Sequence, residues 1–287
     1  MATHTIYGID FTSSPTKSKS ITVAHGRLRG RNLELPEIER LKTFGEFDAF
    51  LQRPGPWVGG FDFPFGLPRE LVETLNWPCD WRALIAHVRL IGKEEFKSAL
   101  NRVRESRPMG ARYIERMGDR LAGSSSPMKL VNPPVGLMFY EGAARLCWSG
   151  VSVIPSAPSG DQRVALEAYP GYLARMLTRK SYKKDGKEGA IPARVAARHD
   201  ILSSLPLYCK SHHGIELALP PELIAHCVTD GSGDALDAVL CAIQAAVSVH
   251  AFEAGDVRYG IPAYADPIEG WIASVPYGER KSSETLT

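Results

Sequence analysis

Two apolar segments that each end in an aspartate decide the fold of this chain. They are Thr5-Ile6-Tyr7-Gly8-Ile9-Asp10 and Trp57-Val58-Gly59-Gly60-Phe61-Asp62. Short runs of β-branched and aromatic residues predict buried strands. The second run is followed at once by Phe63-Pro64-Phe65-Gly66-Leu67-Pro68, whose prolines stop a strand. We therefore predict two core strands with an acid at the carboxyl end of each.

The stretch between these segments predicts how they pair. Residues 20–25 and 31–35 have the spacing of an antiparallel meander that continues from the first strand. Thr43 and Glu46 form a capping box that opens a helix over residues 45–51. Because a helical connection returns the chain beside an earlier strand, we expect the second apolar segment to run parallel to the first.

The composition is that of an ordinary folded protein. The chain has 287 residues, of which 44% are hydrophobic and 23% charged, and its net charge of +2 is too small to indicate nucleic-acid binding through bulk charge. Its start lacks the features of a signal peptide, and polar side chains interrupt the apolar residues 235–252, which predicts a buried helix and no membrane span. The five widely spaced cysteines indicate reduced thiols, so we expect a cytoplasmic protein.

A helical insertion is predicted at about residues 78–160. Residues 80–120 have helical spacing. Their ten lysines and arginines, from Arg82 to Arg120, outnumber the acids. Two interpretations stay open: a basic wall for a nucleic-acid backbone, or solvated helix faces. We expect one domain over residues 1–277 that includes this insertion, followed by a polar tail at 278–287.

After the insertion the sheet pattern resumes. We predict a strand at residues 162–169, helices at 171–177, 192–205 and 221–228, a long helix from Gly233, and a short terminal strand at 268–272. Lysines recur in the loop at residues 180–189, which is either a contact loop or simply solvated: they are Lys180, Lys183, Lys184 and Lys187. Lys17, in the turn after Asp10, has the same two interpretations, a phosphate contact or a solvated turn.

Five carboxylates are predicted to meet at one edge of the sheet: Asp10, Asp62, Glu167, Asp234 and Asp237. Parallel neighbouring strands open their carboxyl ends onto the same edge, and acids spaced i, i+3 share one helix face. Like charges at close range cannot all stay ionised without cations. Because carboxylate oxygens favour Mg²⁺ or Mn²⁺, we expect such an ion on Asp10, Asp62, Asp234 and Asp237, and two ions about 3.5–4 Å apart could serve phosphodiester hydrolysis.

Each acid also has an ordinary structural interpretation. A single aspartate at a strand end is commonly a turn residue. Asp234 alone would be an N-cap or first-turn acid on the helix dipole. Glu167 could simply be exposed. Only the joint pattern favours a site.

Placed in order, these motifs resemble the domain-of-unknown-function family 429, a group of predicted nucleases with a ribonuclease H-like fold. The likeness covers most of the chain, in the motifs around Asp10 and Asp62, Glu167-Ala168-Tyr169-Pro170, Asp234-Ala235-Leu236-Asp237-Ala238 and Glu269-Gly270-Trp271-Ile272. The resemblance implies an α/β fold with a five-stranded mixed sheet flanked by helices, Asp10 on its central strand, and a helical insertion after the fourth strand. It also implies metal binding by Asp10, Asp62 and Asp234 or Asp237.

The expected function is therefore a divalent-metal-dependent nuclease that acts on DNA or RNA through a metal-activated water. One alternative is a non-catalytic nucleic-acid-binding module on the same scaffold. Another is an actin-like ATP-binding protein, which would need a glycine-rich phosphate loop after Asp10. Residues 12–17 contain no glycine, which argues against that alternative.

Overall fold

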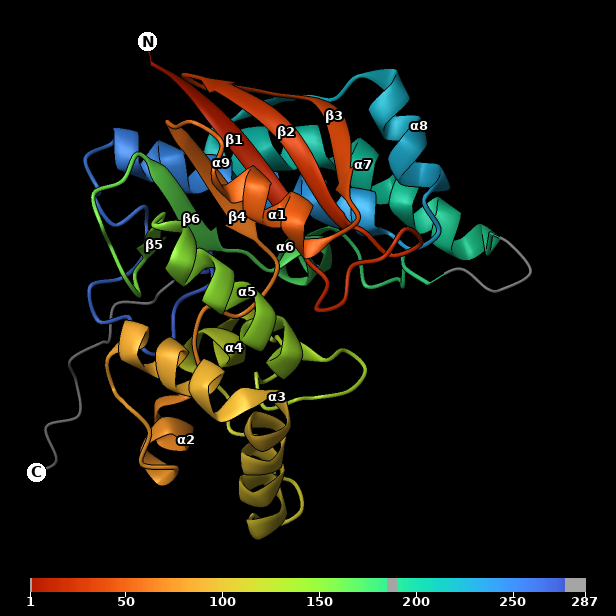
Figure 1. The fold of residues 1–287 in the computed structure, drawn as a ribbon. Coiled ribbons are helices and arrows are strands. Elements are labelled where there is room, and N and C mark those ends of the chain that lie inside the picture. Colours follow the sequence, from red (N-terminus) through yellow and green to blue (C-terminus); the bar gives the residue numbers. More distant parts are fainter. Residues whose placement is uncertain (1, 185–189, 277–287) are drawn as a thin grey trace, which may run out of the picture.

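The centre of the protein is a seven-stranded mixed sheet, seen in a computed structural model that describes residues 2–184 and 190–276 (Figure 1). Its spatial order is β5-β6-β4-β1-β2-β3-β7. The strands are β1 (Thr3–Asp10), β2 (Ile21–Arg29), β3 (Asn32–Leu41), β4 (Trp57–Phe61), β5 (Ser152–Ile154), β6 (Arg163–Glu167) and β7 (Glu216–Ala218). As predicted, β1, β2 and β3 form an antiparallel meander, and β4 runs parallel to β1.

Two features of the sheet differ from the prediction of five strands. β5 and β7 add one short strand at each edge, and each has only three residues, too few to produce a recognisable alternating pattern. The predicted terminal strand at 268–272 was wrong. In that segment Ile272 makes a single isolated bridge to Glu167, because turns occupy most of the residues before it.

Helices cover both faces of the sheet. They are α1 (Phe44–Leu51), α2 (Arg69–Thr74), α3 (Trp81–Ser106), α4 (Met117–Ala122), α5 (Val135–Ser149), α6 (Pro170–Leu177), α7 (Pro192–His213), α8 (Pro221–Thr229) and α9 (Asp234–Glu253). The Thr43 hydroxyl accepts a hydrogen bond from the Glu46 amide at 3.1 Å and caps α1 as predicted. Proline begins α6, α7 and α8, where its fixed φ suits the first turn.

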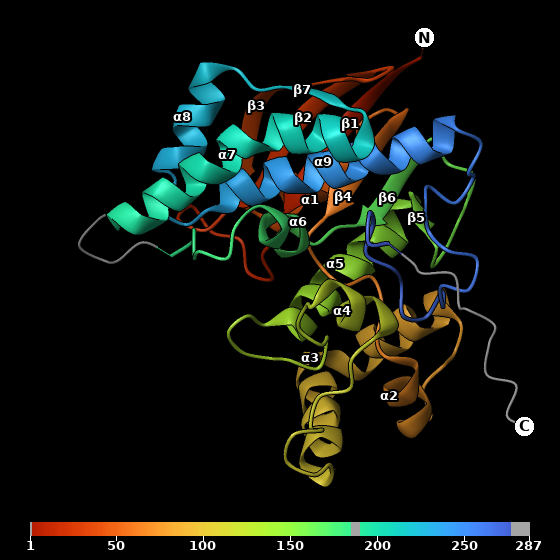
Figure 2. The ribbon, with the colours of Figure 1, turned by 180° about the vertical axis from the view of Figure 1, so that it is seen from behind.

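The long helix α9 packs directly on the sheet. Figure 2 shows α9 and α7 on one face, while α1 lies on the other. Close approach requires glycine: a Cβ at Gly8 would overlap the carbonyl oxygen of Ala238, and one at Gly60 would overlap that of Cys241. Within the described residues α9 is the one helix apolar enough to cross a membrane, but 78% of its apolar window is buried, as in the core helix of a soluble domain.

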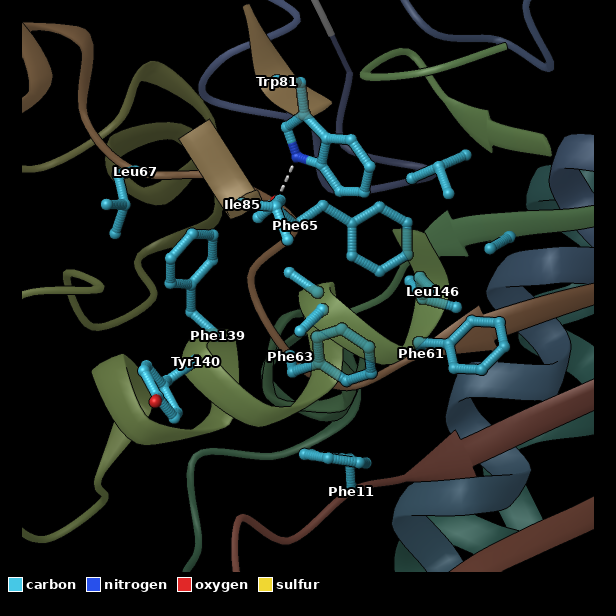
Figure 3. Close-up of a cluster of buried hydrophobic side chains, with 14 of the residues drawn as sticks. Phe11, Phe61, Phe63, Phe65, Leu67, Trp81, Ile85, Phe139, Tyr140 and Leu146 are labelled. Carbon is cyan, nitrogen blue, oxygen red and sulfur yellow. Dashed lines mark hydrogen bonds between the residues drawn. The ribbon is translucent and has the colours of Figure 1, made fainter. Parts of the chain in front are cut away.

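The predicted insertion at about residues 78–160 contains α3, α4 and α5, which lie with α2 beside the sheet (Figure 1), but its predicted end was too late, because β5 belongs to the sheet. Aromatic side chains at the end of β4 and just after it join the two parts, as Figure 3 shows for Phe61, Phe63 and Phe65. The rings of Phe63 and Phe65 have centroids 5.4 Å apart, and the Trp81 indole donates to the Phe65 carbonyl at 2.7 Å. The segment after β4 therefore fixes the insertion against the carboxyl edge of the sheet.

Helical structure does not extend over all of residues 80–120. α3 is kinked at Gly92, which has a φ of 80°, and it ends at Ser106, two residues before Pro108. Proline cannot continue the backbone ladder of a helix, and it disfavours helical geometry in the residue before it. The sequence pattern thus predicted the helices and missed the break between them.

Of the two interpretations of residues 80–120, local ion pairs favour solvated helix faces over a basic wall. Lys97 pairs with Glu94 at 2.8 Å, and Arg102 pairs with Glu95 at the same distance. Arg116 is only 3% exposed and does not contribute to the surface at all. The solvated interpretation therefore describes most of this segment better.

Candidate metal centre

The strand pairing brings Asp10 and Asp62 together. Ile9 on β1 pairs with Phe61 on the parallel β4, and the Asp62 amide then donates to the Ile9 carbonyl at 2.8 Å. Asp10 therefore ends β1 and Asp62 directly follows β4 at the same edge of the sheet, as the sequence predicted.

The start of α9 delivers a third carboxylate to this edge. Asp237 lies in the first turn, after the N-cap Gly233, whose φ of 84° is left-handed. One oxygen each of Asp10, Asp62 and Asp237 lies within 4.8 Å of the other two. Asp237 is buried at 1% exposure, whereas Asp10 and Asp62 are only partly covered. A cation could reach the cluster from this partly open side.

The three acids destabilise one another's ionised forms. Burial raises the pKa of Asp10 well above its usual value, and the charges of Asp237, Asp234 and Asp62 raise it further. Burial likewise raises the pKa of Asp62 to about 7, although Lys183 opposes that shift. The pKa of Asp237 is raised in the same direction, again mainly through burial. Without a cation, this cluster is costly to ionise.

The protein itself supplies few hydrogen bonds to this cluster. Among the described residues none donates a hydrogen bond to the side chain of Asp10 or Asp62. The Thr22 hydroxyl also has no partner, although Thr22 is fully buried. Thr22 pairs directly with Asp10 in the antiparallel ladder, so both side chains lie on the same face of the sheet. Buried polar groups are normally satisfied, so these atoms remain available to a ligand.

Sequence reasoning did not assign Tyr182 and Lys183 to this site. The Tyr182 hydroxyl donates to Oδ1 of Asp237 at 2.7 Å, and the Lys183 ammonium pairs with Oδ2 of the same carboxylate. The sequence leaves Lys183 as either a loop contact or a solvated residue, since nothing local distinguishes it from Lys180 or Lys184. Lys187 lies outside the described residues.

Asp234 lies beside the cluster and not within it. It is less buried than Asp237 and is not one of the three carboxylates that share a 4.8 Å group. Its charge nevertheless raises the pKa of both Asp10 and Asp62. Asp234 therefore adds negative electrostatic potential to the site, although it lies outside the group of three carboxylates.

Glu167 has a different environment from the other predicted acids. It ends β6 as expected, but it is 2% exposed, and both its oxygens bind Arg116, at 2.6 and 2.8 Å. It also accepts a hydrogen bond from the Phe65 amide at 2.9 Å. The exposed alternative for Glu167 is therefore wrong, and its carboxylate is already occupied by a permanent cation.

Arg116 ties the insertion to this part of the sheet. Besides Glu167, its guanidinium binds both oxygens of Asp119 and donates to the Glu269 carbonyl at 2.7 Å. The group of Arg116, Asp119 and Glu167 is almost completely buried. We call it the arginine cluster, and we call Asp10, Asp62 and Asp237 the open cluster.

Comparison with known proteins gives a family and no function. No curated protein and no solved structure matches this chain. One family model matches residues 8–260, which include both clusters and the whole insertion. Since this match covers far more than half of the chain, the protein belongs to the family described as "Protein of unknown function (DUF429)".

Proposed function

We propose that this protein is a divalent-metal-dependent hydrolase of phosphodiester bonds in nucleic acid. One observation carries the proposal: three carboxylates from three separate elements converge within 4.8 Å. Burying several acids together is unfavourable unless a cation joins them. The arrangement is therefore better explained as a binding site than as a contribution to stability.

The donor atoms of the open cluster suit Mg²⁺ or Mn²⁺. All three candidate ligands are carboxylates, with no histidine or cysteine in the group. Hard oxygen donors favour these ions over zinc. The unpartnered Thr22 hydroxyl, beside Asp10 on the ladder, could orient Asp10 or a water in the site.

The acids and Lys183 would have different roles in the reaction. Asp10, Asp62 and Asp237 would hold the ion, and Asp234 would add negative potential at the margin. A divalent ion bound here would activate a water for attack at phosphorus and stabilise the leaving oxygen. Lys183 would place a positive charge beside the phosphate. None of these roles needs a nucleophile from the protein.

The arrangement of the longer strands supports a ribonuclease H-like fold. β3, β2, β1, β4 and β6 are consecutive in the sheet, and β1, which carries Asp10, is the central strand of these five. The insertion follows β4, and a late helix supplies Asp237. These are the features that the family resemblance implied. Nucleic acid as the substrate rests on that resemblance and on Lys183, which pairs with Asp237 in the open cluster.

The proposal can be tested by cleavage assays. Purified protein would be incubated with labelled single-stranded, duplex and branched DNA and RNA in Mn²⁺ or Mg²⁺. We expect cleavage that Asp10→Asn and Asp237→Asn each reduce by at least 100-fold. Asp48→Asn is the matched control, because Asp48 is a half-exposed acid that pairs with Arg145 on the surface. Equal cleavage by Asp10→Asn and wild type would contradict the proposal, and salt-dependent binding without cleavage would favour the non-catalytic module.

A further inference from the structure

Lys183 already places a positive charge inside the open cluster. Its ammonium pairs with Oδ2 of Asp237, and its charge also acts on Asp10 and Asp62. With the Tyr182 hydroxyl on Oδ1, both oxygens of Asp237 are engaged by two consecutive residues. Asp237 therefore differs from Asp10 and Asp62, whose carboxylates receive no hydrogen bond from the described residues.

The core of the protein holds this pair of residues in place. The Arg198 guanidinium is fully buried and donates to the Tyr182 carbonyl at 2.8 Å and to the Val228 carbonyl at the same distance. The stem of Lys183 passes the start of α9 at Gly233, where a Cβ would lie 2.9 Å from its Cγ. Lys183 can therefore reach the cluster for two reasons. The backbone beside it is held by Arg198, and Gly233, which its side chain passes, has no side chain of its own.

A neighbouring lysine shows that this placement is specific. Lys180 lies in the same segment, but its side chain is 68% exposed and pairs with Asp200, which is itself 52% exposed. The Lys183 side chain is 34% exposed, and its partner Asp237 is 1% exposed. A surface pair is weak and readily exchanged, whereas a charge pair on a buried acid persists.

Counting charges indicates how much positive charge the site still requires. The three carboxylates of the open cluster carry three negative charges when ionised, and the Lys183 ammonium cancels one of them. The remaining two negative charges are balanced by one divalent cation. Both oxygens of Asp237 already have partners, so even one ion must share this carboxylate, and a second divalent ion would leave the open cluster with two excess positive charges.

We propose that the Lys183 ammonium takes the place of a second divalent cation, so that the centre binds one Mg²⁺ or Mn²⁺ ion beside this lysine. The inference rests on the proposed metal site and narrows it. It replaces the two-ion arrangement that the acids alone suggest with one metal ion and one fixed organic cation. Lys183 is then a residue of the site and not a loop contact.

The number of bound ions tests this inference without any activity assay. Isothermal titration calorimetry with Mn²⁺ on metal-free protein would be combined with electron paramagnetic resonance, which detects coupling between neighbouring Mn²⁺ ions. We expect one Mn²⁺ per chain in the wild type and two coupled ions in Lys183→Met. Lys183→Arg, which keeps a cation, should return the number to one. Lys180→Met is the matched control and should also bind one ion.

The outcomes separate this inference from the proposed function. Two ions in the wild type, or one ion in Lys183→Met whatever its affinity, would overturn the role of Lys183 while leaving the metal site intact. Wild-type protein that binds no Mn²⁺, or whose binding survives Asp10→Asn, would overturn both. Near-ultraviolet circular dichroism of each variant confirms that the fold is retained.

Discussion

The open cluster and the arginine cluster lie at the same edge of the sheet and bury their acids in different ways. In the arginine cluster, the guanidinium of Arg116 binds both carboxylates with two hydrogen bonds each. In the open cluster, Asp237 alone has hydrogen-bond or ion-pair partners among the described residues. Burial raises the pKa of Asp10 and Asp62, and it also raises that of Glu167 although Arg116 opposes the shift. A buried acid with a permanent, well-fitted cation has its charge balanced within the fold, whereas buried acids without one are suited to an exchangeable ion.

Breaking the arginine cluster should have the largest effect. Arg116→Met would leave Asp119 and Glu167 buried without their cation, and we expect the free energy of unfolding to fall by about 3–5 kcal/mol. Urea denaturation followed by circular dichroism measures this change. Arg102→Met removes an exposed pair with Glu95 and should cost less than about 1 kcal/mol. Similar losses in the two variants would show that burial of Arg116 is energetically unimportant.

The open cluster should make stability depend on pH with a predictable sign. The pKa of Asp62 is about 7 in the folded protein, against about 3.9 for an unfolded aspartate. The folded state therefore holds this proton more tightly, and its contribution to stability, full below pH 4, is lost as the pH rises through 7. We expect metal-free wild type to lose about 2–4 kcal/mol over this range relative to Asp10→Asn/Asp62→Asn. The free energy of unfolding would be measured by urea denaturation at each pH. The same pH dependence in both proteins would contradict the proposed origin of the pKa shift.

Metal ions should stabilise through the open cluster alone. At a Mn²⁺ concentration of 100 times Kd, the gain in free energy of unfolding is about 2.7 kcal/mol. Thermal unfolding with Mn²⁺ and with EDTA should show this gain in the wild type and not in Asp10→Asn. Glu167→Gln should keep the gain even though the variant is less stable overall. Loss of the gain in Glu167→Gln would place Glu167 in the metal site.

Substitution of Asp234, which lies beside the open cluster, should have the smallest effect on metal binding. Asp234→Asn removes one charge beside the cluster, and we expect Mn²⁺ affinity to fall by about fivefold, as for a partly solvated charge. Asp237→Asn removes a ligand and should weaken binding by at least 100-fold. Calorimetric titration compares the two variants directly. Equal losses would mean that Asp234 binds the ion too.

Local sequence patterns were sufficient for most elements of the fold. Strand segments were recognisable because their apolar runs end in breakers, and α1 because Thr43 and Glu46 form its cap. The edge strands β5 and β7 were not recognisable, since three residues carry no periodicity. The gap between α3 and α4 was not predicted, although Pro108 lies just after the end of α3 and disfavours helical geometry before it.

The sequence by itself determined that acids would stand at the ends of β1, β4 and β6 and in the first turn of α9, because apolar runs and helix starts are local features. Only the tertiary structure decided which of these acids receive a cation from the protein. Glu167 and Asp62 look alike in sequence, yet Arg116, 51 residues before Glu167, neutralises only one of them. Lys183 reaches Asp237 across 54 residues for the same reason: burial makes an acid require a counter-charge, and chain packing selects the one it finds.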